Sequence, residues 1–225
     1  MSHTALLVFA KVPEPGRVKT RLVPQLTPQQ AAEIHRACLE DTVRAAGAVP
    51  GARPWLMVAP SKEPPQRLSA ALNLGRGWRV EPQRGRHLGE RLQHAFAQRF
   101  REGASKVLVV GTDTPWMGRE RLARAIAWLD RAPAVLGPCD DGGYYLAGAR
   151  RLVPQIFRGI PWGTSRVLEA TLRALELAGA KYLLLPRDFD LDRPEDLGRA
   201  VELLRRQPQR ASSLARCLGS LGLEI

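Results

Sequence analysis

Cysteine is scarce in this 225-residue chain, which contains only Cys38, Cys139 and Cys217. The three residues are far apart in the sequence, and no two of them have C-x-x-C spacing. The sequence therefore indicates neither a disulfide framework nor a zinc site. A reducing, cytoplasmic environment is the location that we expect from this cysteine content.

The chain also lacks any apolar run near the roughly 20 residues that a membrane-spanning helix requires. Its N-terminal segment, from Met1 to Ala10, has no basic part and reaches Lys11 after a short apolar stretch. This pattern predicts a β-strand rather than a signal peptide. We therefore expect no membrane partner.

Acidic residues are outnumbered, because 34 Lys and Arg against 22 Asp and Glu give a formal net charge of +12. Such an excess can indicate binding to nucleic acid or anionic lipid. The basic residues are mostly arginines scattered from Arg17 to Arg216, and no aromatic–basic RNA motif accompanies them. The dispersal favours a general compositional trait, so a nucleic-acid-binding protein is kept only as a remote alternative.

Short apolar segments alternate with longer amphipathic ones, which is typical of βα units that build a mostly parallel sheet flanked by helices. The predicted strands cover residues 5–10, 54–59, 78–83, 106–111, 134–137, 143–148 and 182–186. The predicted helices cover 28–46, 64–73, 88–101, 119–130, 165–178 and a segment ending near 206. The first of them is predicted to begin with a capping box, with Thr27 as N-cap, Pro28 at the first helical position and Gln30 as the capping-box glutamine. No repeat or linker interrupts the pattern, so we predict one α/β domain over 1–225, with 208–225 as a peripheral, partly helical tail.

The clearest candidate site is the segment AKVPEPGRVKTRL at 10–22, directly after the first predicted strand. Its prolines and Gly16 exclude a helix and predict a tight loop. Four cations fall within eleven residues of this loop, namely Lys11, Arg17, Lys19 and Arg21. They repel one another unless an anion lies among them, and ligands of open α/β sheets bind at strand ends. The loop therefore predicts a phosphate site, with a solvated basic loop as the alternative.

This loop does not have the Walker A pattern, because Val18 stands where that motif requires glycine before Lys19 and Thr20. The sequence thus predicts phosphate binding by a different loop type, with Lys19 as a candidate catalytic residue.

Asp113 lies in the GTDTP segment at 111–115, at the end of the most apolar predicted strand. A carboxylate there, beside a glycine, suits Mg²⁺ or Mn²⁺. An Asp-x-Pro turn stabilised by its own side chain has the same sequence. Its expected position opposite the basic loop favours the metal.

Asp192 lies in the acidic segment 188–196, where alternate spacing places Asp188, Asp190 and Asp192 on one face of an extended chain. That arrangement is costly without a cation. Asp192 is also followed three residues later by Glu195, which predicts a helix N-cap. The two roles are compatible, because one carboxylate oxygen can cap while the other binds metal.

The segment DDGGYY at 140–145 combines a carboxylate, Asp141, with the paired Gly142 and Gly143, which allow close backbone approach. Tyr144 adds a ring or a hydroxyl. A glycine-rich hairpin turn is the simpler interpretation. We nevertheless predict a substrate-binding wall, with Asp141 as a candidate catalytic base.

Two further residues are weaker candidates. Gln83, close to the charged segment 89–91, is a candidate for nucleotide binding, and Trp162 in 161–164 for substrate binding. Helix-surface charges at Glu90 and Arg91 and an N-cap at Thr164 are the simpler alternatives.

These motifs together resemble the bacterial DUF2064 proteins, described as glycosyltransferases of the GT-A type, a branch of which is linked to arsenosugar biosynthesis. The similar segments are FAKVPEPGRVKTRL (9–22), HLGERLQHAF (87–96), GTDTP (111–115), LGPCDDGGYYLAG (136–148), GIPWGTSRVLEAT (159–171) and DLDRPEDL (190–197). The resemblance implies the single-domain GT-A fold of nucleotide-diphosphosugar transferases. The sequence departs from the family pattern at residues 86–87 and at residues 116–117. Both departures lie beside the predicted site and bear on the identity of the acceptor.

The same fold occurs in nucleotidyltransferases that make CMP-sugars, molybdopterin dinucleotides and guanylylated phospholactate. The resemblance to them implies that the first loop binds the nucleotide, that Asp113 binds metal, and that Asp192 supplies a second metal ligand. We predict a metal-dependent transfer from a nucleotide-activated donor, an NDP-sugar, to a small acceptor, with Mg²⁺ or Mn²⁺ as cofactor. A nucleotidyltransferase that uses an NTP and releases pyrophosphate is the main alternative, and a non-catalytic nucleotide sensor is a further one.

Overall fold

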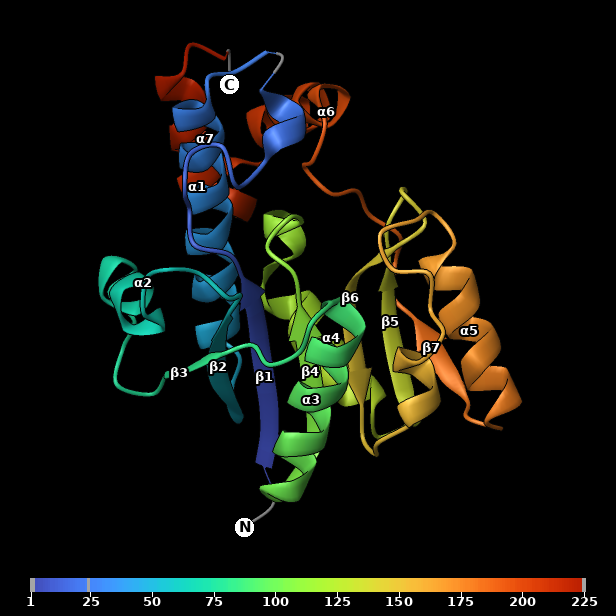
Figure 1. The fold of residues 1–225 in the computed structure, drawn as a ribbon. Helices are drawn as coiled ribbons and strands as arrows, with labels where there is room; N and C mark the ends of the chain where they lie inside the picture. The colour runs from blue at the N-terminus through green and yellow to red at the C-terminus, as the bar shows by residue number, and fades with distance from the viewer. Residues whose placement is uncertain (1–2, 24, 224–225) are drawn as a thin grey trace.

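The structure is a computed structural model that describes residues 3–23 and 25–223. The first two residues of the predicted N-terminal strand segment and the last two of the predicted tail lie outside the described residues. A seven-stranded sheet, in the order β3-β2-β1-β4-β6-β5-β7, forms the centre of the molecule (Figure 1). Its strands are β1 (His3–Ala10), β2 (Ala52–Val58), β3 (Arg79–Pro82), β4 (Ala104–Val110), β5 (Ala134–Pro138), β6 (Tyr144–Ala149) and β7 (Tyr182–Leu184).

Most neighbouring strands of this sheet are parallel. β1 pairs in parallel with β2 and β4, β2 with β3, and β5 with β7. Only β6 is antiparallel to its neighbours β4 and β5. The predicted α/β class with a mostly parallel sheet is therefore confirmed. Since β6 runs opposite to β4, the loop that precedes β6 lies at the same edge as the C-terminal ends of β1 and β4.

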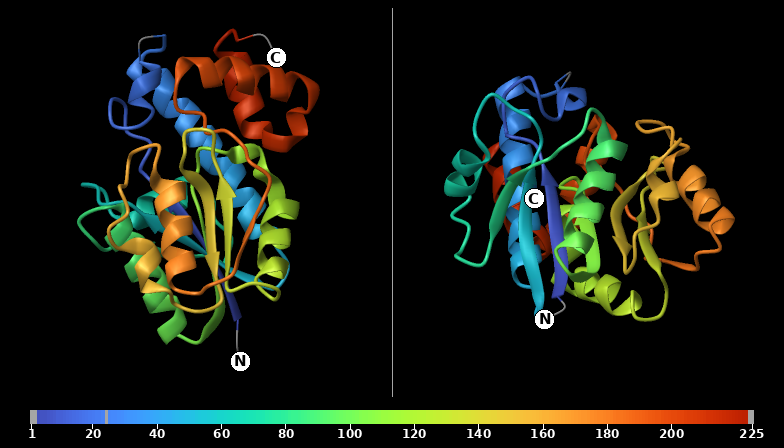
Figure 2. Two further views of the ribbon diagram at one scale, coloured as in Figure 1. Left: turned by 90° about the vertical axis from the view of Figure 1, so that its right-hand side faces the viewer. Right: turned by 60° about the horizontal axis from the view of Figure 1, so that its bottom comes forward.

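Helices cover both faces of the sheet (Figure 2). The α-helices of the described residues are α1 (Pro28–Gly47), α2 (Pro65–Ala71), α3 (Leu88–Arg101), α4 (Gly118–Trp128), α5 (Val167–Leu177), α6 (Pro194–Arg206) and α7 (Ser212–Ser220). Alternate residues of β1 enter different cores: Leu6 and Val8 pack with α1 and α4, whereas Ala5 and Leu7 pack with α3 and α5. The continuously apolar strands predicted from the sequence are thus buried on both faces.

The C-terminal helices pack against α1 above the sheet in the view of Figure 1. Leu197 and Leu204 of α6 and Leu214 and Leu218 of α7 share one hydrophobic cluster with Cys38 of α1. The predicted tail contains a short 3-10 turn, Pro208–Ala211, and α7. Within the described residues, no helix is both long and apolar enough to cross a bilayer.

The predicted capping box at the start of α1 is confirmed. Gln30 donates its backbone N–H to the Thr27 hydroxyl at 3.2 Å, and Thr27 donates its backbone N–H to the Gln30 side chain at 2.9 Å. Thr27→Ala is expected to lower the free energy of unfolding by about 1 kcal/mol. Chemical denaturation would measure this loss. The exposed Gln29→Ala is the matched control and should cost less than about 0.5 kcal/mol; equal effects would contradict the cap.

Candidate functional site

The loop after β1, the loop before β6, the segment before α5 and the segment before α6 line a cavity of about 790 Å³. Lys11 and Arg21, from the loop after β1, contribute basic side chains to its wall. Asp141, Tyr144 and Trp162 contribute an acidic and aromatic part. The structure therefore brings together parts of the two predicted sites that are more than a hundred residues apart in the sequence.

Carboxylates outnumber cations on the wall of this cavity, although the chain as a whole is strongly basic. The acidic residues are Asp140, Asp141, Asp190, Asp192, Glu195 and Asp196, and the basic ones are Lys11, Arg21 and Arg193. A cavity of this composition can hold a ligand that presents anionic groups at one place and cations or hydroxyl groups at another.

Lys19 is buried beside the cavity and does not line it. Its backbone has φ 48° and ψ 34°, the left-handed region that few non-glycine residues adopt. Its ammonium donates to Asp113 Oδ1, to the backbone carbonyl of Leu191, and to Asp192 Oδ1 at 3.2 Å. These three oxygens compensate the buried positive charge.

Burial and charge act in opposite directions on this group. Burial alone would lower the pKa of Lys19, but the negative charges of Asp113 and Asp192 outweigh it and raise the pKa above its usual value. Burial likewise tends to raise the pKa of Asp113, and the positive charge of Lys19 reverses this and lowers the pKa. The lysine is therefore charged, and Asp113 is ionised, at neutral pH.

Asp113 and Asp192, the predicted metal pair, meet at this ammonium. The backbone N–H of Leu191 donates to the carbonyl of Asp113 at 2.8 Å, which ties the segment after β4 to the segment before α6. The two carboxylate side chains are 39% and 40% exposed, whereas the Lys19 side chain is 2% exposed. The carboxylates are thus accessible from solvent while the ammonium is covered.

The prediction that Asp192 is the N-cap of the following helix is wrong. Pro194 is the first residue of α6, so Arg193 holds the cap position. The Asp196 carboxylate accepts from the backbone N–H groups of Asp192 at 3.2 Å and Arg193 at 2.8 Å. Asp192 is therefore outside the cap, and its own carboxylate binds Lys19.

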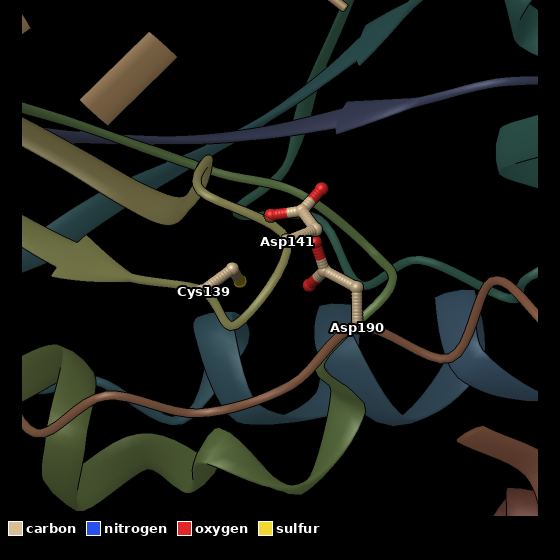
Figure 3. Close-up of side chains that lie close together, drawn as sticks. All are labelled: Cys139, Asp141 and Asp190. Atoms are coloured by element: carbon tan, nitrogen blue, oxygen red, sulfur yellow. The ribbon is translucent and has the colours of Figure 1, made fainter. Parts of the chain in front are cut away.

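Asp190 belongs to a second cluster that the sequence analysis missed. Its carboxylate accepts from the Thr114 hydroxyl at 2.6 Å and lies near Asp141 and Cys139 (Figure 3). One potential ligand atom from each of these three residues lies within 4.8 Å of the others. Burial, together with the nearby negative charge of Asp113, raises the pKa of Asp190 to about 7. The spacing of Cys139 in the sequence carries no signal of this cluster, because its partners are brought close only by the fold.

Asp188 is the remaining acidic residue of the predicted extended face, and its contacts are with structural side chains. It pairs with Arg121 and accepts from the indole N–H of Trp116 at 2.9 Å. These contacts attach the segment before α6 to the α4 region, away from the cavity wall.

The glycine-rich loop before β6 holds Asp141 in place. Gly142 has φ +85°, and a Cβ at this position would lie 2.0 Å from the Ser165 carbonyl oxygen. Gly142 also accepts from the backbone N–H of Leu168 at 2.8 Å, and Gly143 donates its N–H to Asp141 Oδ1 at 2.8 Å. One oxygen of Asp141 is thus fixed by the backbone.

Tyr144 and Trp162 form the aromatic part of the cavity wall, with ring centroids 6.2 Å apart and nearly perpendicular planes. Gly89 of α3 makes room for the indole, because a Cβ there would lie 2.2 Å from Trp162 Nε1. That nitrogen is buried and has no hydrogen-bond partner among the described residues. The glycine of the LGER segment therefore has a packing role that spacing alone did not reveal.

The remaining predicted phosphate-binding residues lie away from the cavity wall. Arg17 is exposed and pairs with Glu14 at 3.2 Å, and Gly16 supplies the positive φ of the loop. Gln83 is buried and donates its side-chain amide to the Met57 carbonyl at 2.8 Å, at the end of β2. Of the predicted phosphate loop, Lys11 and Arg21 are the cations that line the cavity.

Comparisons with known proteins agree with this architecture. Residues 42–164 match the family model described as "Uncharacterized protein conserved in bacteria (DUF2064)". No curated protein matches the chain. A crystal structure described as a "putative nucleotide-diphospho-sugar transferase" from Desulfovibrio desulfuricans G20 is 32% identical, with 100% of each chain covered and a TM-score of 0.90.

More distant solved structures share the fold. CMP:2-keto-3-deoxy-manno-octonic acid synthetase in complex with CTP is 12% identical over 92% of this chain and 100% of that chain, with a TM-score of 0.56. Rv0371c of Mycobacterium tuberculosis H37Rv in complex with manganese is 18% identical over 89% and 98%, with a TM-score of 0.54. At such identities the likeness concerns the fold, and the predicted nucleotide-diphosphosugar transferase fold is confirmed.

Proposed function

Because the chain belongs to the bacterial DUF2064 family, we propose that it is a transferase that moves a glycosyl group from an NDP-sugar to a small acceptor, assisted by a divalent cation. The 32% identical structure, described as a "putative nucleotide-diphospho-sugar transferase", covers the whole chain and supports this reaction class. We regard residues 1–225 as one transferase domain.

The observation that carries the proposal is the composition of the 790 Å³ cavity between the loop after β1, the loop before β6 and the segment before α6. Lys11 and Arg21 suit the phosphates of a nucleotide, because charge-assisted hydrogen bonds to phosphate are strong. Tyr144 and Trp162 suit a sugar or acceptor ring, for which aromatic walls provide apolar contact. Donor and acceptor would thus meet within one space.

Asp113 and Asp192 are the residues that would hold Mg²⁺ or Mn²⁺. Their oxygens already converge on a cation, the ammonium of Lys19, and their side chains are about 40% exposed. Carboxylate oxygens are the ligands that these hard cations prefer, so the donor set fits. A divalent cation bound there would offset negative charge on the departing diphosphate.

Asp141 is the proposed base that accepts the proton of an acceptor hydroxyl. The Gly143 N–H fixes its Oδ1, while the residue lies on the cavity wall. A base must lie within hydrogen-bond reach of the proton that it removes, and a fixed carboxylate fulfils this requirement more readily than a mobile one. Gly142 and Gly143 would then position the acceptor rather than react.

A nucleotidyltransferase is the second candidate. The two cations on the cavity wall, Lys11 and Arg21, also suit the phosphates of a triphosphate. The fold is shared with a structure whose title names a bound CTP. In this reaction the leaving group would be pyrophosphate instead of a nucleoside diphosphate.

The released product distinguishes the two reactions. The protein would be incubated with Mn²⁺, a panel of small hydroxyl acceptors, and either NDP-sugars or NTPs. We expect release of a nucleoside diphosphate from one NDP-sugar, dependent on acceptor and metal. Pyrophosphate release from an NTP, without diphosphate release, would replace our proposal by the second candidate. A thermal-shift screen with and without Mn²⁺ would first identify the nucleotide that stabilises the fold.

A further inference from the structure

We propose that Lys19 is the resident cation of the Asp113–Asp192 site in the ligand-free protein, and that a divalent metal binds there together with a phosphate ligand rather than before it. This inference rests on the proposed function, which assigns the two aspartates as metal ligands.

The geometry around Lys19 is that of a cation site. An ammonium has three N–H donors, and here they reach Asp113, Asp192 and the Leu191 carbonyl. The Leu191 carbonyl oxygen is the third oxygen around the ammonium, and no sequence motif indicates this role. Because the Leu191 N–H also binds the Asp113 carbonyl at 2.8 Å, the three oxygens belong to two segments that the backbone holds together.

The burial of Lys19 indicates that it stays in this position. Its side chain is 2% exposed, and withdrawal would break three hydrogen bonds and leave two carboxylates without their counter-charge. Direct phosphate contacts are therefore the role of Lys11 and Arg21, and Lys19 positions the aspartates from the protein side.

The charge balance then controls metal entry. Two carboxylates and one ammonium leave a net charge of −1, and Arg21 Nη1, 3.9 Å from Asp192 Oδ2, reduces it further. A divalent ion gains little from such a weakly charged pair. A bound diphosphate restores the missing negative charge, so metal and phosphate each strengthen the binding of the other, as linkage requires.

Binding of Mn²⁺, measured by equilibrium dialysis as the excess of total Mn²⁺ in the protein chamber over the protein-free chamber, tests this inference without any activity assay. Pyrophosphate itself binds Mn²⁺ in solution, and this excess counts only the metal that the protein retains. Wild type, Lys19→Met and Lys106→Met would be titrated with and without inorganic pyrophosphate. Lys106→Met is a matched control, because Lys106 pairs with Asp130 at 2.6 Å, away from the site. Without pyrophosphate, we expect Lys19→Met to bind Mn²⁺ about tenfold more tightly than wild type, and Lys106→Met within about twofold.

Pyrophosphate should tighten Mn²⁺ binding of the wild type about tenfold, and of Lys19→Met clearly less. The inference is overturned if Lys19→Met binds Mn²⁺ no more tightly than wild type, or if pyrophosphate leaves wild-type binding unchanged. If Lys19→Met does not fold, the comparison of wild-type Mn²⁺ binding with and without pyrophosphate decides whether the inference holds. Asp113→Asn separates the two proposals. If this variant binds Mn²⁺ as the wild type does, the assignment of the metal site is wrong. If it loses Mn²⁺ binding but Lys19→Met binds Mn²⁺ no more tightly than wild type, only the present inference is wrong.

Discussion

Asp113→Asn is expected to abolish metal-dependent nucleotide binding, with an affinity loss of at least about 100-fold in the presence of Mn²⁺. Asparagine keeps the shape of the side chain but lacks the negative charge. The fold should persist, because Lys19 keeps its contacts with Asp192 and the Leu191 carbonyl. The loss would therefore report on the metal rather than on unfolding.

Isothermal titration with the nucleotide selected by thermal shift, with Mn²⁺ and with EDTA, measures this effect. In EDTA the variant and the wild type should bind alike, because Lys11 and Arg21 are unchanged. Asp130→Asn is the matched control, since Asp130 is a surface residue whose partner Lys106 lies on β4. If Asp113→Asn binds the nucleotide as well as the wild type in Mn²⁺, Asp113 is not the metal ligand.

The fold was predictable because its signals are local. The apolar run of β4 and the capping box of α1 depend on neighbouring residues only, and both are present in the structure. The predicted order of strands and helices needs no knowledge of distant contacts. For the same reason the loop after β1 and the segment after β4 could be placed at one edge of the sheet.

The contacts inside the site depend on distant residues and could not be read from spacing. Lys19 lies 94 residues from Asp113 and 173 from Asp192. Its left-handed backbone follows no composition rule, since such a conformation in lysine requires surrounding structure to impose it. The N-cap expectation for Asp192 was wrong because α6 begins at Pro194, which gives the cap position to Arg193.

Gly142→Ala is expected to lower the transfer rate strongly while the nucleotide site stays intact. Alanine at φ +85° is strained, and its Cβ would lie 2.0 Å from the Ser165 carbonyl oxygen. That backbone cannot easily yield, because Gly142 is hydrogen-bonded to Leu168 at the start of α5. The loop must therefore move and displace Asp141. We expect the transfer rate to fall about 100-fold, since small misplacements of a catalytic group have such effects.

The free energy of unfolding should fall by about 2–3 kcal/mol in Gly142→Ala, as measured by chemical denaturation. Gly179→Ala separates strain from clash, because Gly179 has φ +61° but nothing within 4 Å of its Cβ. This control should lose about 1 kcal/mol and keep full activity, since only the conformational penalty remains. Nucleotide affinity should stay within about threefold in both variants, because the basic wall is untouched. A Gly142→Ala protein with normal transfer would show that the loop before β6, and Asp141 with it, lies outside the reacting centre.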